Sequence, residues 1–387
     1  MHKLQSDKTI TKRRRRIPRT FIAGSAMLLS TGLLQLSARG CPGFGQWYAV
    51  RIYPLITGTL GRFIGLFPFS VVEFGLYCLI LLCLVFLARN FRRPLKLLGS
   101  AFCLVSALAL VFTLNCGINY YRLPFSAHSG LEIRKSSAEE LYSLCGYLVD
   151  QINRTEEKMS VLSPYEGQTA ETPPPTFGML NSYGEEARAA MEGLGEEFPE
   201  LGGFYPRPKA LLVSRILSVQ QLCGIYSPFT VEANYNREMP RYNIPHTICH
   251  ELSHLKGFMR EDEANFIGYM ACIGSDDLQF RYSGYLTGWV YAGNALAKID
   301  MDAYIELHKK LPPQAVVDLA YNNAFWDHFD GKVAEASTRV NDTYLKMQNQ
   351  TDGVKSYGRM VDLMLAYYRE ALSPQAQEGG PQAGTVN

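Results

Sequence analysis

The chain has 387 residues, of which 47% are hydrophobic, and a formal net charge of +2 at pH 7. This length allows more than one domain, and the nearly balanced charge gives no indication of a nucleic-acid partner. None of the nine cysteines forms a CxxC pair, which argues against a cysteine zinc site, and we expect no disulfide.

Three largely apolar stretches lie in the first third of the chain, at about residues 21–38, 71–88 and 97–116. Each has about the length that a helix needs to cross the hydrocarbon core of a lipid bilayer. We therefore expect residues 1–118 to form a membrane anchor. The first stretch could also be a cleaved signal peptide, but no convincing small-residue cleavage site follows it, which favours a retained helix.

Basic residues flank these stretches unevenly. A run of Lys and Arg occupies residues 12–16, and Arg89, Arg92, Arg93 and Lys96 lie between the second and third stretches. Because such residues stay in the cytoplasm, the N-terminus and the second loop should be inside. The pattern predicts a multi-pass membrane protein, with everything after Cys116 on the extracytoplasmic side.

The remainder should form one domain at residues 119–372, followed by a disordered tail at 373–387 that is rich in Gln, Gly and Pro. Residues 163–178 contain three consecutive prolines and should form an exposed loop. The expected elements are helices at about 137–153, 184–198, 246–257 and 261–274, β-like segments at 209–217 and 224–234, and mainly helix from 274 to 372. The predicted fold class is α+β, a mainly helical domain with a small sheet.

An HExxH pattern lies in the helix expected at 246–257, with His250, Glu251 and His254 at its defining positions. Residues four apart share one face of a helix, so both imidazoles can reach one ion. Glu251 stands beside the first histidine, where it can take a proton from a metal-activated water. The pattern predicts a Zn²⁺ site with Glu251 as catalytic base, although a bare HExxH can also be a helix with two surface histidines.

A catalytic zinc site needs a third protein ligand. His246 is also four residues from His250, but it lies about 12 Å from His254 along a helix axis, so one ion is not shared by all three. Arg260 stands where some HExxH proteases place a third histidine. The acidic residues Glu261, Asp262 and Glu263 are therefore the source of the third ligand.

The HExxH helix and the following Glu-x-x-Ala-Asn segment resemble the gluzincin metalloproteases. The resemblance implies a zincin-like metallopeptidase domain, with Glu261 as the third metal ligand and Asn265 as a residue that orients a ligand histidine. Asn265 stands where Asp is more usual, and only six residues separate His254 from Glu261. Glu263 therefore stays open as the alternative ligand.

More of the chain resembles a bacterial family of membrane proteins called domain of unknown function 3810. The resemblance rests on the three apolar stretches and on the sequences GIYSPFTVEANYN (224–236), IPHTICHELSHLKGF (244–258), REDEANFIGYMAC (260–272) and NDTYLKMQNQTDGVKSYGRMVDL (341–363). It covers most residues from about 43 to 372. It implies a metallopeptidase domain but names no substrate.

Residues 224–236 could form a strand that pairs with an extended peptide substrate, or an ordinary sheet strand. Four tyrosines could contact substrate or polarise a scissile carbonyl, although a buried tyrosine with a satisfied hydroxyl is the commoner case. They are Tyr226, Tyr282, Tyr285 and Tyr357.

We therefore expect a membrane-anchored zinc metallopeptidase that hydrolyses peptide bonds in a peptide or protein substrate. Three alternatives stay open: a sensor-transducer, a non-catalytic zinc-binding membrane protein, and a zinc amidase that acts on cell-wall peptide. The sequence does not indicate the oligomeric state.

Overall fold

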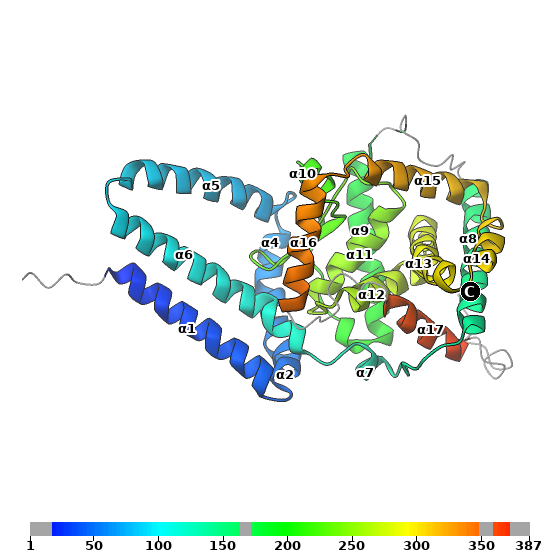
Figure 1. Ribbon diagram of the computed structural model, residues 1–387, viewed down its shortest axis with the longest axis horizontal. Helices are drawn as coiled ribbons and strands as arrows, with labels where there is room; N and C mark the ends of the chain where they lie inside the picture. The colour runs from blue at the N-terminus through cyan, green and yellow to red at the C-terminus, as the bar shows by residue number, and fades with distance from the viewer. Residues whose placement is uncertain (1–17, 163–171, 173, 348–358, 372–387) are drawn as a thin grey trace, which may run out of the picture.

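The computed structural model describes residues 18–162, 172, 174–347 and 359–371. Three long helices project from one end of a body that is made mostly of helices and contains one small sheet (Figure 1). The predicted combination of apolar N-terminal helices, a mainly helical body and a small sheet is confirmed. The predicted tail at 373–387 and Tyr357 lie outside the described residues.

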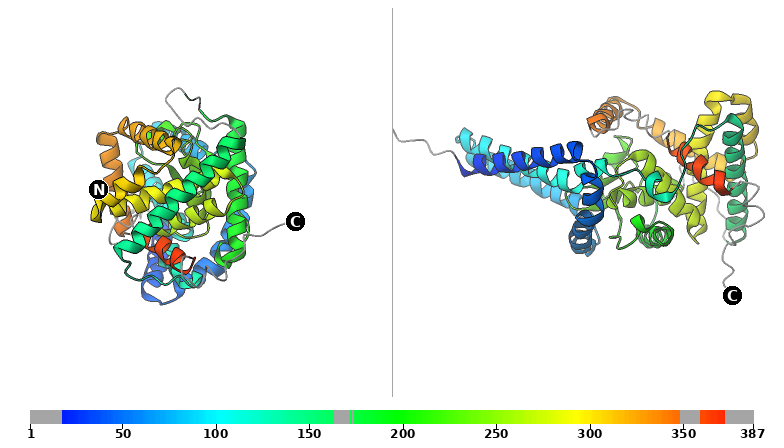
Figure 2. Two further views of the ribbon diagram at one scale, coloured as in Figure 1. Left: turned by 90° about the vertical axis from the view of Figure 1, so that its right-hand side faces the viewer. Right: turned by 90° about the horizontal axis from the view of Figure 1, so that it is seen from below.

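The projecting helices are α1 (Arg19–Gly40), α5 (Val71–Asn90) and α6 (Pro94–Asn115), and each is long and apolar enough to cross a membrane. α1 packs closely along α6. The approach is so close at Gly24 that a β-carbon there would lie only 2.6 Å from the Phe102 ring. α5 meets α6 at the far end and diverges from it toward the body (Figure 1), and the view from below also shows these helices projecting from one end of the body (Figure 2). The two helices thus form a V that opens toward the body.

The segment between α1 and α5 is largely helical. It contains α2 (Phe44–Arg51), α3 (Tyr53–Ile56), the π-helical turn η1 (Thr57–Gly61) and α4 (Arg62–Gly65). Tyr53 is almost fully buried at its centre. The hydroxyl of Tyr53 bonds to that of Tyr226 in the body, and buried Tyr48 donates to the carbonyl of Leu114 at the end of α6.

The body begins after α6, and its helices surround a continuous apolar core in which α11, α12 and α13 pack against one another. The remaining elements before the sheet are η2 (Gly117–Tyr121), α7 (Ser126–Ser129), α8 (Ala138–Leu162), α9 (Phe177–Glu197) and η3 (Pro199–Leu201). Those after the sheet are α11 (Asn243–Leu255), α12 (Glu261–Gly274), α13 (Leu278–Ile299), α14 (Met301–His308), α15 (Pro313–Asp327), α16 (Lys332–Met347) and α17 (Met360–Ala371).

The sheet has three short strands, β1 (Lys209–Ala210), β2 (Gly224–Ser227) and β3 (Glu232–Tyr235), in the order β1-β3-β2. β1 is parallel to β3, whereas β2 is antiparallel to it. β2 is therefore an edge strand, and its free side is turned toward α11, with which it is in contact.

Two buried carboxylates join α5 to this sheet. Glu232 of β3 accepts hydrogen bonds from the backbone N–H groups of Val71 and Val72, at 2.9 and 2.8 Å, and caps the start of α5. Glu73 of α5 in turn accepts bonds from the backbone of Leu212 and Val213, at 2.9 Å each. The sheet thus caps α5, and α5 in turn binds the backbone donors of the segment after β1, which fixes α5 to the body.

The structure corrects several expected boundaries. The helix expected at 137–153 continues to Leu162, and the β-like segment 224–234 consists of the two strands β2 and β3 with a turn between them. The β-like segment 209–217 contains only the two residues of β1, and the helical turn α10 (Arg215–Ser218) follows, because Glu73 takes the backbone donors of residues 212 and 213. The helix expected at 184 begins at Phe177, because the hydroxyl of Thr176 accepts a bond from the backbone of Met179 and caps it.

Candidate metal centre

The HExxH pattern lies on α11, which buries Ile244, Ile248 and Leu252 on one face. The helix ends in a Schellman turn at Gly257, whose φ is +86°. The backbone N–H of Gly257 bonds to the carbonyl of His254, and that of Phe258 bonds to the carbonyl of Ser253. A side chain with a β-carbon rarely adopts this φ, so glycine allows the chain to reverse directly after the second histidine.

The chain then runs only five residues before α12 begins at Glu261, the predicted first residue. This short connection brings the first turn of α12 beside α11, and the two helices pack together. Glu261 is therefore held opposite the two histidines.

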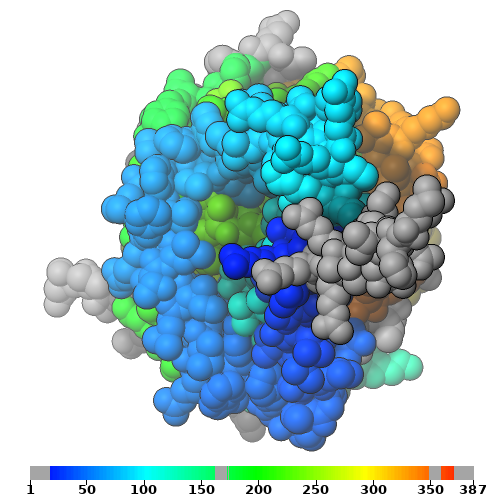
Figure 3. All heavy atoms as spheres, turned by 90° about the vertical axis from the view of Figure 1, so that its left-hand side faces the viewer, coloured from blue at the N-terminus to red at the C-terminus, as the bar shows by residue number. Residues whose placement is uncertain are grey.

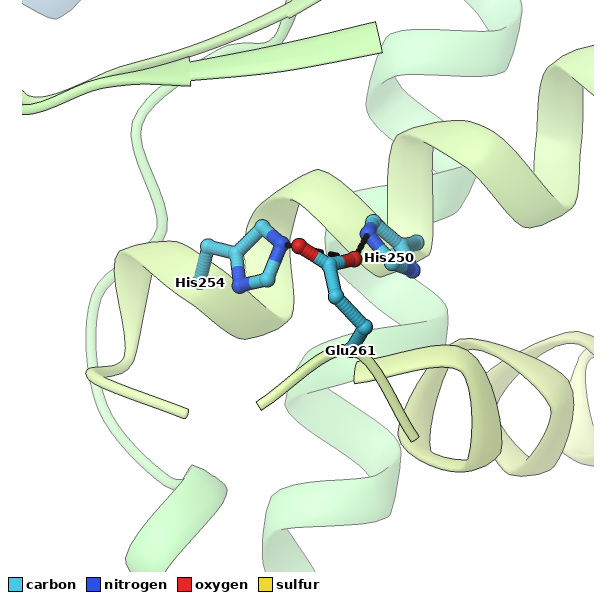
Figure 4. A group of neighbouring side chains, drawn as sticks. All are labelled: His250, His254 and Glu261. Carbon is cyan, nitrogen blue, oxygen red and sulfur yellow. Dashed lines mark ion pairs between the residues drawn. The ribbon is translucent and has the colours of Figure 1, made fainter. Parts of the chain in front are cut away.

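Three side-chain atoms converge there, Nε2 of His250, Nε2 of His254 and Oε2 of Glu261. Oε2 lies 3.3 Å from the first nitrogen and 3.8 Å from the second, and the three ligand atoms lie within 4.8 Å of one another. Figure 4 shows the Glu261 carboxylate between the two rings. Ligands of a tetrahedral zinc ion are about 3.3 Å apart, from bond lengths of about 2.0–2.1 Å, so these residues could hold such an ion.

The opposite nitrogen of each imidazole is also fixed. Nδ1 of His250 lies 2.8 Å from Oδ1 of Asn265, and Nδ1 of His254 lies 2.7 Å from the carbonyl oxygen of Phe258. Because both oxygens only accept, each Nδ1 must donate, so in a neutral ring the Nε2 lone pair is the one that points toward Glu261. This is the arrangement that orients histidine ligands around a metal.

The pKa values of the two histidines are shifted in opposite directions. Burial lowers the pKa of His254 to about 4, so the ring is neutral at pH 7 with its Nε2 lone pair available. Burial alone would lower the pKa of His250 as well, but the hydrogen bond and charge of Glu261 raise it above its ordinary value. The point between His250 and Glu261 thus attracts positive charge.

Glu251 lies on the neighbouring face of α11, against the edge strand β2. Its carboxylate accepts a backbone hydrogen bond from Tyr226, whereas its Oε2 atom is buried without a hydrogen-bond partner among the described residues. Burial raises the pKa of this carboxyl to about 8. A buried oxygen with unused bonding capacity and a proton affinity near neutral pH suits a group that accepts and releases a proton.

Glu263, the alternative third ligand, is buried on another side of α12. Its Oε1 accepts bonds from the backbone of Phe125 at 3.0 Å and from Arg260 at 3.1 Å. His246 is buried with its Nε2 3.0 Å from the carbonyl oxygen of Asn265. The structure therefore brings Glu261 to His250 and His254. Glu263 and His246 are bonded elsewhere and do not join this group.

A cleft of about 950 Å³ extends from these residues. Its walls include β2, the end of α6 and one face of α16, to which Val333, Ala336, Ser337, Val340, Asn341 and Tyr344 contribute. Tyr291 of α13 also lines it, and burial, with smaller effects of Cys223 and Glu261, raises the pKa of that phenol. Sequence reasoning missed Tyr291 and the face of α16, although the repeat of apolar residues at 333, 336, 340 and 344 was a signal.

The predicted substrate tyrosines separate into different environments. Tyr226 lines the cleft, but its hydroxyl is bonded to the hydroxyl of Tyr53 at 2.8 Å and donates to the carbonyl of Asn115 at 3.1 Å. Tyr282 donates to Asp318 at 2.7 Å, and Tyr285 is buried; neither is among the described residues that line the cleft. Of the predicted tyrosines that are described, only Tyr226 is therefore placed at the site.

A family described as "Protein of unknown function (DUF3810)" matches residues 48–365. No curated protein and no solved structure matches the chain. The family match spans the end of α2, two of the three apolar helices, the sheet and the histidine–glutamate cluster. The chain therefore belongs to the DUF3810 family.

Proposed function

We propose that this protein is a zinc-dependent, gluzincin-like peptidase in which His250, His254 and Glu261 hold the ion. The observation that carries the proposal is the convergence of three ligand atoms within 4.8 Å of one another beside a buried glutamate that has a free carboxylate oxygen. Two imidazoles and one carboxylate are a ligand set found in catalytic zinc sites, which keep one position for water.

Zinc supplies Lewis-acid chemistry when bound: it makes water more acidic and polarises a carbonyl oxygen. Glu251 moves the proton. Its Oε2 accepts a proton from the attacking water and delivers it to the departing amide nitrogen. One water is consumed, the C–N bond breaks, the carbonyl carbon gains oxygen as a carboxyl group, and the nitrogen leaves as an amine.

The edge strand β2 supports a peptide substrate. The backbone N–H of Asn236 bonds to the carbonyl of Cys223, so residues 223 and 225 face β3 and residues 224 and 226 point their backbone groups away from it. Gly224 and Tyr226 line the cleft. The Tyr226 N–H on this edge bonds the Glu251 carboxylate, so an extended peptide would add to β2 at Gly224, beside Glu251, with main-chain hydrogen bonds that do not depend on its sequence.

A comparison of protein N-termini in cells tests the proposal even while the substrate is unidentified. Cells that carry the wild type should contain new N-termini that are absent from cells with Glu251→Gln. Glu157→Gln, an exposed change on α8, is the matched control and should behave as the wild type. Identical N-termini in all three strains under conditions of strong expression would contradict the proposal.

A further inference from the structure

The cleft begins where one of the apolar helices ends. Phe112, in the last turn of α6, and Cys116, directly after it, line the same cleft as His250, Glu251 and His254. α6 is one of the three helices that are long and apolar enough to cross a membrane. If α6 spans the bilayer, the candidate metal centre stands at the bilayer surface and not at the far side of the body.

Hydrogen bonds connect the end of α6 to the strand beside the candidate metal centre. The Asn115 side chain at the end of α6 donates to the carbonyl of Pro228 at 2.6 Å, and its own carbonyl accepts from Tyr226. The Tyr226 ring is 6.4 Å from the His254 ring, measured between centroids. The end of α6, the β2–β3 turn and the metal centre are thus linked through directly contacting residues.

The walls of the cleft near α6 carry exposed apolar side chains. Ile225 and Phe229 of the β2–β3 hairpin are each 44% exposed, and Val333 and Val340 of α16 are 56% and 69% exposed. Figure 3, which views the molecule from the end with the apolar helices, shows a hollow among them with green atoms from the middle of the chain at its floor. Apolar residues that gather in a cleft are typical of a binding surface for an apolar ligand.

We propose that the substrate is the juxtamembrane segment of a membrane-anchored polypeptide, an extended apolar stretch just outside the bilayer. This inference rests on the proposed peptide hydrolysis and adds where the scissile bond lies. A segment that leaves the bilayer at the end of α6 meets the apolar walls first and then reaches the free edge of β2. The same walls offer little to a polar cell-wall peptide.

The experiment uses full-length protein in lipid nanodiscs with a single-span substrate. The substrate carries three copies of one cleavable apolar sequence, starting about 5, 20 and 35 residues from its span, which at full extension reach about 17, 70 and 120 Å. We expect cleavage at the first copy to exceed that at the third by at least tenfold. Equal cleavage of the three copies, or preference for the third, would overturn the inference while the peptidase activity stands.

The same polypeptide without its span is the control, and its three copies should be cleaved equally. Phe112→Ala should slow cleavage of the first copy in the anchored substrate, whereas Val105→Ala, an exposed position on α6 away from the cleft, should not.

Substrate binding is measured separately from hydrolysis, so that failure of the proposed peptidase activity can be distinguished from failure of the proposed binding site. A photo-crosslinking amino acid at Val340 in the Glu251→Gln protein should capture the anchored substrate at its first copy. The same amino acid at Arg339, which is exposed on α16 but does not line the cleft, should not. Capture without any wild-type hydrolysis would refute the proposed function and support the binding site, whereas equal capture of all three copies would overturn the inference.

Discussion

Gly224 lies so close to Glu251 that a β-carbon at position 224 would be 2.5 Å from Oε1 and 2.9 Å from Cδ of the carboxylate. No real β-carbon approaches so closely, so the edge strand can pass the proposed base only because residue 224 has no side chain. The backbone of β2 thereby holds the carboxylate in place.

Gly224→Ala should displace Glu251 or push β2 away from it. We expect hydrolysis to fall by about 10²–10⁴-fold, the usual contribution of a general base, while zinc content is unchanged because the ligands lie on α11 and α12. Gly146→Ala is the matched control, since a β-carbon there meets nothing within 4 Å. Normal activity in Gly224→Ala would show that the position of Glu251 against β2 is unimportant.

Substitution of each candidate third ligand should show whether Glu261 or Glu263 binds the zinc ion. Glu261→Gln should lower zinc affinity severely, whereas Glu263→Gln should keep it, because the amide oxygen can still accept from Phe125. Asn265→Ala should reduce affinity by roughly 10–100-fold through loss of the bond to His250. Competition with a zinc chelator measures all three, and loss of zinc from Glu263→Gln alone would reverse the assignment.

The buried ion pair beneath α5 should contribute strongly to stability. Nζ of Lys209 lies 2.7 Å from Oε1 of Glu232, and both side chains are 2% exposed. Lys209→Met leaves a buried carboxylate without its partner, which costs about 3–5 kcal/mol of unfolding free energy. The double variant Lys209→Met/Glu232→Gln should lose less than Lys209→Met alone. Denaturant titration in detergent measures this difference, and additive losses would mean that the pair is not coupled.

The orientation of the chain in the membrane follows from its basic residues and can be tested with single cysteines. Exposed Cys41, Cys78 and Cys83 are first replaced by serine, and then Arg92→Cys or Lys135→Cys is introduced at exposed positions. In spheroplasts, in which the cell membrane is intact and accessible from outside, a membrane-impermeant thiol reagent should label position 135 and not position 92. Labelling of position 92 alone would place the body in the cytoplasm.

The sequence predicted well those features that depend on local patterns. The apolar helices, the α11 helix and the start of α12 at Glu261 follow from periodicity and from glycine and proline signals. The choice between Glu261 and Glu263 needed the angle between two helices, which no local pattern contains.

Other features depend on contacts between distant segments. The bonds of Glu73 and Glu232 join residues about 140 and 160 positions apart, and they decide where β1 stops and how α5 begins. The placement of α16 over the cleft is of the same kind. A single sequence reveals the apolar face of such a helix but not which surface it covers.

The most direct test of the central claim measures zinc content and peptide hydrolysis together in the purified full-length protein. We predict one zinc per chain in the wild type and in Glu251→Gln, with hydrolysis of a peptide library in the wild type and a loss of about 10²–10⁴-fold in the variant. Loss of zinc from Glu251→Gln, or equal hydrolysis by both proteins, would contradict the assignment of Glu251 as the base of a zinc peptidase.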